Sequence, residues 1–147
     1  MNTHTYLRAY LAGIFLPTLV LPLLLIFVVV RLVYQVPIPV EQMLIFPMAV
    51  VPLLWGLWNM LWLWSGPRTH IPVGLHGAVL PLLLMPMGAT LASALGVLAI
   101  GSHGVVWFGV CSVPYTLIAP VFLGALAGYY LVWKYIVGFL NRVLGIA

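Results

Sequence analysis

Four long apolar stretches, separated by short loops, run through the chain at about residues 9–33, 43–64, 76–100 and 105–131. A helix needs about 20 predominantly apolar residues to cross the hydrocarbon core of a bilayer, and each stretch meets that length. Only 4% of the 147 residues are charged, whereas a soluble domain carries about 25%. A surface so poor in charge must face lipid. The sequence therefore predicts an all-α integral membrane protein: one domain, residues 1–147, in which two helical hairpins form a bundle of four transmembrane helices.

The connections between the stretches carry residues that break helices. Pro37 and Pro39 stand in the first connection, Gly66 and Pro67 in the second, and the third is the short segment GSHG. Proline lacks a backbone donor and clashes with the preceding turn, so these segments end the helices before them. The first apolar run exceeds the roughly 7–15 residues of a signal-peptide core. It is therefore expected to remain as the first span.

The basic residues predict the orientation of the bundle. With four spans, the N-terminus, the second loop and the C-terminus share one side of the membrane. That side carries Arg8, Arg68, Lys134 and Arg142, and the other side carries only Arg31. Lys and Arg are enriched in cytoplasmic loops, so both termini are expected in the cytoplasm of a multi-pass cell (inner) membrane protein. The basic residues are spread along the chain, which argues against a nucleic-acid partner.

The segment after Trp133 is too long to belong entirely to the fourth span. A continuous helix from residue 105 to 146 would measure about 60 Å, roughly twice the hydrocarbon thickness. Lys134, Gly138 and Asn141 recur at helical spacing among apolar residues in this segment. The pattern predicts a short amphipathic helix at the inner interface. A frayed end of the fourth helix is the alternative.

Every apolar stretch contains two prolines, five or six residues apart. Each proline frees the carbonyl four residues earlier, and lipid cannot satisfy that carbonyl. Thr18 and Thr116 precede a proline by four residues, where a hydroxyl can supply a donor. One interpretation is a kinked bundle whose carbonyls line a polar pathway; the other is that proline is common in membrane helices. The prolines are Pro17 and Pro22, Pro47 and Pro52, Pro81 and Pro86, and Pro114 and Pro120.

The prolines of the first and third stretches align with each other. Pro17 falls on Pro81 at an offset of 64 residues, and the same alignment superposes Leu16 on Leu80. This match raises the hypothesis that a two-helix hairpin was duplicated in tandem.

Small residues lie at four-residue spacing in the third and fourth stretches, as Gly88, Ala92 and Gly96 and as Gly124 and Gly128. Such faces let helix backbones approach closely. From the inner edge, the first set lies at about 18–30 Å and the second at about 8–14 Å. The two sets therefore cannot pack on each other. One is expected to serve the bundle and the other a neighbouring subunit.

Acidic side chains are almost missing. Glu41 is the sole carboxylate among the side chains, and it lies at the outer edge of the second stretch. Proton-coupled transport, paired-carboxylate catalysis and carboxylate-bound metals all need such groups within a site. The sequence therefore predicts neither an enzyme nor a cofactor or metal site. Cys111 is the only cysteine, so the chain forms no internal disulfide.

Histidine, tryptophan and asparagine are the remaining polar candidates. His70 and His76, together with His4, can share the inner face as a metal-binding or pH-sensitive cluster, or they are ordinary interfacial residues. Trp55 belongs to a stripe on the second span that suits a quinone or lipid ligand, or ordinary packing and anchoring. Asn59 lies deep in the same span and is expected to hydrogen-bond another helix. The other members of the stripe are Trp58 and Trp62.

Two functions fit this sequence. The first is a small non-catalytic membrane subunit that packs within, or anchors, a larger complex. The alternative is an oligomeric channel or facilitator for an uncharged solute or an ion, lined by proline-freed carbonyls. The expected partners are the lipid bilayer and other membrane subunits or further copies of the chain.

Overall fold

A computed structural model describes residues 3–35, 46–107, 109 and 111–146. The described chain is mostly helical. The first hairpin consists of α1 (Thr3–Val33) and α2 (Phe46–Thr69), and the second of α3 (Val73–Ala94) and α4 (Tyr115–Val132). The predicted loop with Pro37 and Pro39, together with Glu41, lies outside the described residues.

Three helical stretches are long and apolar enough to cross a membrane, and they span His4–Val33, Val73–Ala94 and Tyr115–Val143. This finding agrees with the predicted helical membrane protein. The described part of α2 is not among the three stretches. Its sequence contains Asn59 and several tryptophans, which are less hydrophobic than the Leu, Val and Ile residues that dominate α1.

A small antiparallel sheet joins α3 to α4, where the sequence predicted helix. Its strands are β1 (Leu98–Ile100), β2 (Gly104–Trp107) and β3 (Cys111–Pro114), hydrogen-bonded in the order β1-β2-β3. The predicted spans 76–100 and 105–131 were therefore wrong at their outer ends. Cys111 and Pro114 belong to a strand, so the fourth helix contains Pro120 but not Pro114.

A glycine cap explains where α3 stops. Gly96 adopts a left-handed φ of +70°, which a residue without a Cβ reaches at little cost. Its N–H donates to Ser93 O at 3.0 Å, and the N–H of Val97 donates to Ala92 O at 2.8 Å. This pair of bonds is a Schellman motif, which satisfies the last carbonyls of a helix. Gly96 therefore lies beyond the helix rather than on a packing face with Gly88.

The tail continues the fourth helix. α4 passes through one π-helical turn, η2 (Trp133–Val137), into α5 (Gly138–Val143). The stretch Tyr115–Val143 has 29 residues and measures about 43 Å at 1.5 Å per residue. A second Schellman motif at Gly145 ends it, with Ile146 N donating to Asn141 O at 2.8 Å. The tail is therefore not a separate interfacial helix. It continues the fourth helix, and it is helical to Val143 rather than the frayed end that was the alternative.

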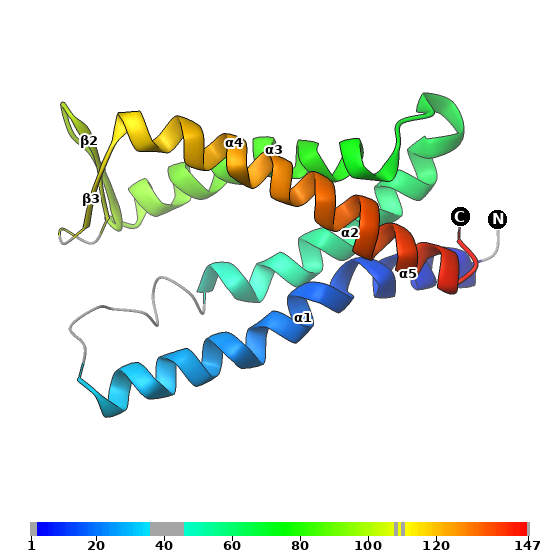
Figure 1. Ribbon diagram of the computed structural model, residues 1–147, viewed down its shortest axis with the longest axis horizontal. Coiled ribbons are helices and arrows are strands. Elements are labelled where there is room, and N and C mark those ends of the chain that lie inside the picture. The colour runs from blue at the N-terminus through cyan, green and yellow to red at the C-terminus, as the bar shows by residue number, and fades with distance from the viewer. Residues whose placement is uncertain (1–2, 36–45, 108, 110, 147) are drawn as a thin grey trace.

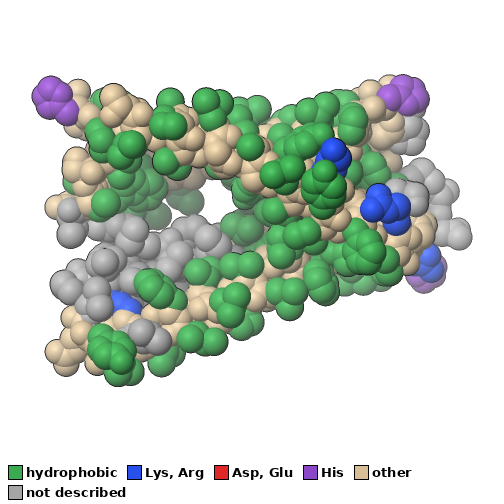
Figure 2. Space-filling view, viewed as in Figure 1, with side chains coloured by type: hydrophobic (Ala, Val, Ile, Leu, Met, Phe, Trp, Pro, Cys, Tyr) green, Lys and Arg blue, Asp and Glu red, His purple; other side chains and the backbone are tan. Residues whose placement is uncertain are grey.

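The two hairpins meet at one end and diverge towards the other. Helices pack extensively within each hairpin, whereas α2 and α3 contact each other over only a short length. Both termini lie at the joined end, and the sheet lies at the opposite end (Figure 1). Figure 2 shows hydrophobic side chains over both hairpins, with Lys and Arg mainly near the termini. An apolar exterior of this kind suits lipid rather than water.

Candidate functional site

The region where the two hairpins meet, called the joint below, contains a reciprocal pair of buried side-chain amides. Asn59 on α2 and Asn141 on α5 are both 0% exposed. Asn59 Nδ2 donates to Asn141 Oδ1 at 2.8 Å, and Asn141 Nδ2 donates to Asn59 Oδ1 at 3.1 Å. Asn59 Nδ2 also donates to Ala9 O on α1 at 2.7 Å. The interhelical hydrogen bond expected of Asn59 is thus present, and it ties three helices together.

A second reciprocal contact joins α2 to α3. The indole N–H of Trp58 donates to His76 O at 2.8 Å, and His76 Nε2 lies 3.2 Å from Trp58 O. A carbonyl oxygen only accepts, so His76 carries its proton on Nε2 in this contact. The two rings stack with centroids 4.8 Å apart and planes at 28°. His76 is therefore a packing and hydrogen-bonding residue of the joint.

Two tryptophans fill the core of the joint. The rings of Trp55 and Trp133 lie 5.5 Å apart, with Leu80 and Val137 in the same buried cluster. Among the described residues, neither indole N–H has a hydrogen-bond partner. The Trp55 and Trp58 part of the predicted aromatic stripe thus serves packing between helices.

Glycines let each hairpin close against its own tryptophan. A Cβ on Gly13 would lie 2.5 Å from Trp55 O, and a Cβ on Gly77 would overlap the side chain of Trp133. Gly13 and Gly77 are 64 residues apart, the same offset that aligns Pro17 with Pro81. The contacts themselves differ, because Gly13 meets the backbone of Trp55 and Gly77 meets the side chain of Trp133. Trp55 and Trp133 are also 78 residues apart, whereas the prolines of the even-numbered stretches are 67 or 68 apart, so the two contacts do not support the duplication hypothesis. Sequence reasoning overlooked these glycines, although each stands four residues before an aligned proline.

The predicted small-residue faces are not used inside the described fold. A Cβ on Gly88, Gly124 or Gly128 would meet nothing within 4 Å. Ala92 is partly buried, and Gly96 lies beyond the end of α3. The close helix contacts instead involve Gly13, Gly56, Gly74 and Gly77.

The residues of the predicted proline pathway lie in different environments. Thr18 Oγ1 donates to Ile14 O at 2.7 Å, not to a carbonyl that a proline frees, and Thr116 is exposed on α4. In both α1 and α3, the first proline is buried and the second is exposed. These pairs are Pro17 and Pro22 on α1, and Pro81 and Pro86 on α3; Pro47 and Pro52 lie on α2.

His70 lies apart from the joint, in the connection between α2 and α3. It is exposed and has a left-handed φ of +51°, while His76 is buried against Trp58. Within the described ranges, no three His, Cys, Asp or Glu residues come together as a group that could hold a metal ion. The two histidines therefore occupy different environments rather than one metal-binding cluster with His4.

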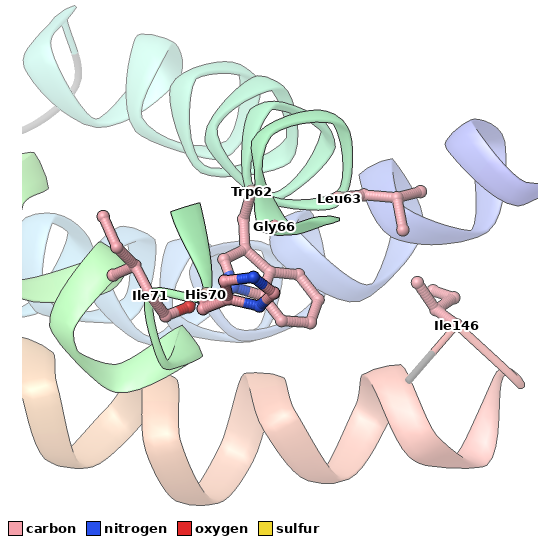
Figure 3. Close-up of a pocket in the computed structure, with 6 residues that line it drawn as sticks. All are labelled: Trp62, Leu63, Gly66, His70, Ile71 and Ile146. Atoms are coloured by element: carbon pink, nitrogen blue, oxygen red, sulfur yellow. Dashed lines mark hydrogen bonds between the residues drawn. The ribbon is translucent and has the colours of Figure 1, made fainter. Parts of the chain in front are cut away.

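A shallow pocket opens beside His70 at the end that carries the termini (Figure 3). Its volume is about 370 Å³. Trp62 forms one wall, and its indole N–H donates to Ile71 O at 3.1 Å. The lining residues come from the end of α2, the following connection and the C-terminal segment: Trp62, Leu63, Gly66, His70, Ile71 and Ile146.

The fold and its apolar exterior define a class of protein, the helical membrane proteins. Comparisons with protein-family models, curated proteins and solved structures returned no match.

Proposed function

We propose that this chain is a non-catalytic polytopic membrane subunit that packs within, or anchors, a larger membrane complex. The observation that carries the proposal is the unused glycine surface on the second hairpin. Gly88 on α3, and Gly124 and Gly128 on α4, face open space, whereas the glycines of the joint are closely packed. Helices in a bilayer associate through such surfaces, because small residues allow close backbone contact.

The incomplete contact between the hairpins supports the same proposal. The hairpins are held at one end by the Asn59–Asn141 pair and the Trp58–His76 contact. Towards the sheet they diverge (Figure 1). In lipid there is little hydrophobic drive to close such a space, because lipid tails are as apolar as leucine. Helices of a partner that supply van der Waals contact and matching small residues would complete the bundle.

The proposed topology has four spans, with α2 as the second and both termini in the cytoplasm. Its 24 residues give α2 a length of about 36 Å, enough for the hydrocarbon core. The position of both termini at one end of the molecule, with most basic side chains, supports this orientation (Figures 1 and 2). 

Purification of the full chain in mild detergent, followed by mass measurement, tests the proposal. We expect foreign membrane chains to co-purify. Gly124→Leu or Gly128→Leu should reduce that association, because the new side chain occupies the space that a partner backbone needs. Ala119→Leu is the matched control, since Ala119 is exposed on another face of α4. A monomer, or equal effects of all three substitutions, would contradict the proposal.

A closed homo-oligomer would instead favour the alternative, a channel or facilitator. The divergence of the hairpins is the structural feature that favours this alternative, because several copies could enclose a pathway between them. Solute flux into liposomes that contain only this chain would then be expected.

A further inference from the structure

We propose that the pocket beside His70 binds the headgroup region of an anionic phospholipid from the surrounding membrane. Its binding groups are the His70 imidazole and the apolar wall formed by Trp62 and Ile146, and the segments that adjoin it supply the guanidinium groups of Arg8 and Arg68. The proposal rests on membrane insertion, but it does not depend on the chain being a subunit of a complex.

The pocket offers one polar group above an apolar wall. Figure 3 shows His70 beside Trp62, with Ile146 across the opening. The Trp62 indole N–H is already bonded to Ile71 O, whereas the exposed His70 side chain bonds no other described residue. A neutral imidazole still has one N–H donor in either tautomer. His70 is therefore available to a phosphate or ester oxygen.

Two arginines belong to segments that adjoin the pocket, although neither of them lines it. Arg68 lies in sequence between the lining residues Gly66 and His70, and its guanidinium sits 4.8 Å from the Trp64 ring centroid. Arg8 reaches the C-terminal segment, with Nη1 3.4 Å from Leu144 O and 4.0 Å from a Cβ built on Gly145. Gly145 precedes the lining residue Ile146.

Among the described residues, no acidic side chain balances the basic side chains at this end of the molecule. The sequence contains five Lys and Arg residues and a single acidic residue, Glu41, and its net charge is +4. Glu41 lies outside the described residues, and no described residue is acidic. Arg8 lies near the start of α1 and Arg68 near the end of α2. An anion from outside the chain is the natural complement of these cations.

The combination of groups favours a lipid over a soluble anion. The pocket lies where helices end, beside aromatic residues of the kind that occupy membrane interfaces. A headgroup phosphate can accept from His70 and the arginines, while the glycerol and first acyl carbons contact Trp62, Leu63 and Ile146. A free phosphate would leave that apolar wall unused.

Native mass spectrometry of the detergent-purified full chain tests this binding. Dioleoyl phosphatidylglycerol and dioleoyl phosphatidylcholine would be titrated separately, since they share acyl chains and differ in headgroup charge. We expect phosphatidylglycerol to bind roughly tenfold more tightly, the effect of about one to two basic groups near a phosphate. Equal affinity for the two lipids would overturn the proposal.

Matched substitutions locate the site. His70→Asn removes the imidazole and keeps a residue type that tolerates left-handed backbone, and Arg68→Gln removes one charge. Each should weaken phosphatidylglycerol binding about fivefold. His103→Asn and Arg31→Gln, which lie towards the sheet end of the molecule, should leave it unchanged. Equal losses from both pairs would indicate general charge attraction and overturn the assigned site.

A competition experiment separates the lipid from a soluble source of the same chemistry. Glycerol-3-phosphate at millimolar concentration should not displace phosphatidylglycerol, because it lacks the acyl chains that contact the apolar wall. Its displacement of the lipid would overturn the proposal in favour of a soluble phosphate ligand. These readouts report lipid adducts, so they are independent of whether foreign chains co-purify.

Discussion

Asn59 and Asn141 lie 82 positions apart in the chain, yet their side-chain amides donate to each other across the buried joint. Asn59 also donates to the backbone of Ala9. The two residues thereby connect the start of α1, the middle of α2 and the end of the long fourth helix. A polar pair in an apolar bundle is directional, so it fixes the register in which the hairpins meet.

The reciprocal amides should be energetically coupled. Asn59→Leu leaves the Asn141 side-chain amide buried without its partner, and Asn141→Leu leaves the Asn59 amide with the Ala9 carbonyl as its remaining partner. Each change should cost about 1–3 kcal/mol of unfolding free energy. The double substitution should cost less than the sum of the two, because it removes both amides together. Unfolding in mixed detergent micelles, followed by circular dichroism, measures these changes. Additive losses would show that the pair does not act as a unit.

Substitution by alanine should be far less well tolerated at the closely packed glycines than at the glycines that face open space. Gly77→Ala places a methyl group against Trp133 and forces the buried cluster apart, at about 1–3 kcal/mol. Gly13→Ala should have a similar effect, because the new methyl group meets the backbone of Trp55. Thermal unfolding in detergent compares these variants with wild type.

Gly88→Ala is the control, since its Cβ would meet open space. It should stabilise α3 by about 1 kcal/mol through helix propensity alone. Loss of stability at Gly88 equal to that at Gly77 would contradict the assignment of close contacts to the joint.

The orientation can be checked with topology reporters. Fusions after Ala147 and within the connection near Thr69 should report the cytoplasm, and a fusion near Pro39 should report the far side. The expectation follows from the excess of basic residues at the end that carries the termini. A reporter after Ala147 that is active on the far side would exclude this topology.

Much of the helical framework was predictable, because about 20-residue apolar runs have few alternatives in a bilayer. The prediction for Asn59 was confirmed for a related reason, since a buried amide in lipid must find a partner. Its partner Asn141 was not predictable. The tail was expected to leave the bundle, and no local pattern indicates a contact between residues so distant in sequence.

The sheet was missed because hydropathy does not distinguish strand from helix in short apolar segments. Val105, Val106 and Trp107 favour strands, and Gly101 and Gly104 flank a tight connection, but a hydropathy window averages over these signals. The close glycine contacts were missed for a different reason. Which glycine faces a partner depends on the rotation of each helix, and the spacing of small residues alone does not fix it.

Substitution of the exposed prolines distinguishes the proposed subunit from the alternative, a channel. Pro22→Ala and Pro86→Ala each restore a backbone N–H that can bond the carbonyl four residues earlier, on Thr18 and Leu82. If those carbonyls line a pathway, both substitutions should reduce solute flux through reconstituted liposomes while the protein still inserts. If the chain is a subunit, wild-type liposomes should be impermeable and the substitutions should not change that. We expect the second result, together with weaker association with partner chains, because a straightened helix no longer fits a surface shaped for the kink.

Pro17→Ala and Pro81→Ala serve as the comparison, since those prolines are buried and should mainly alter stability. Wild-type flux that either exposed-proline substitution abolishes would replace the subunit proposal with the channel.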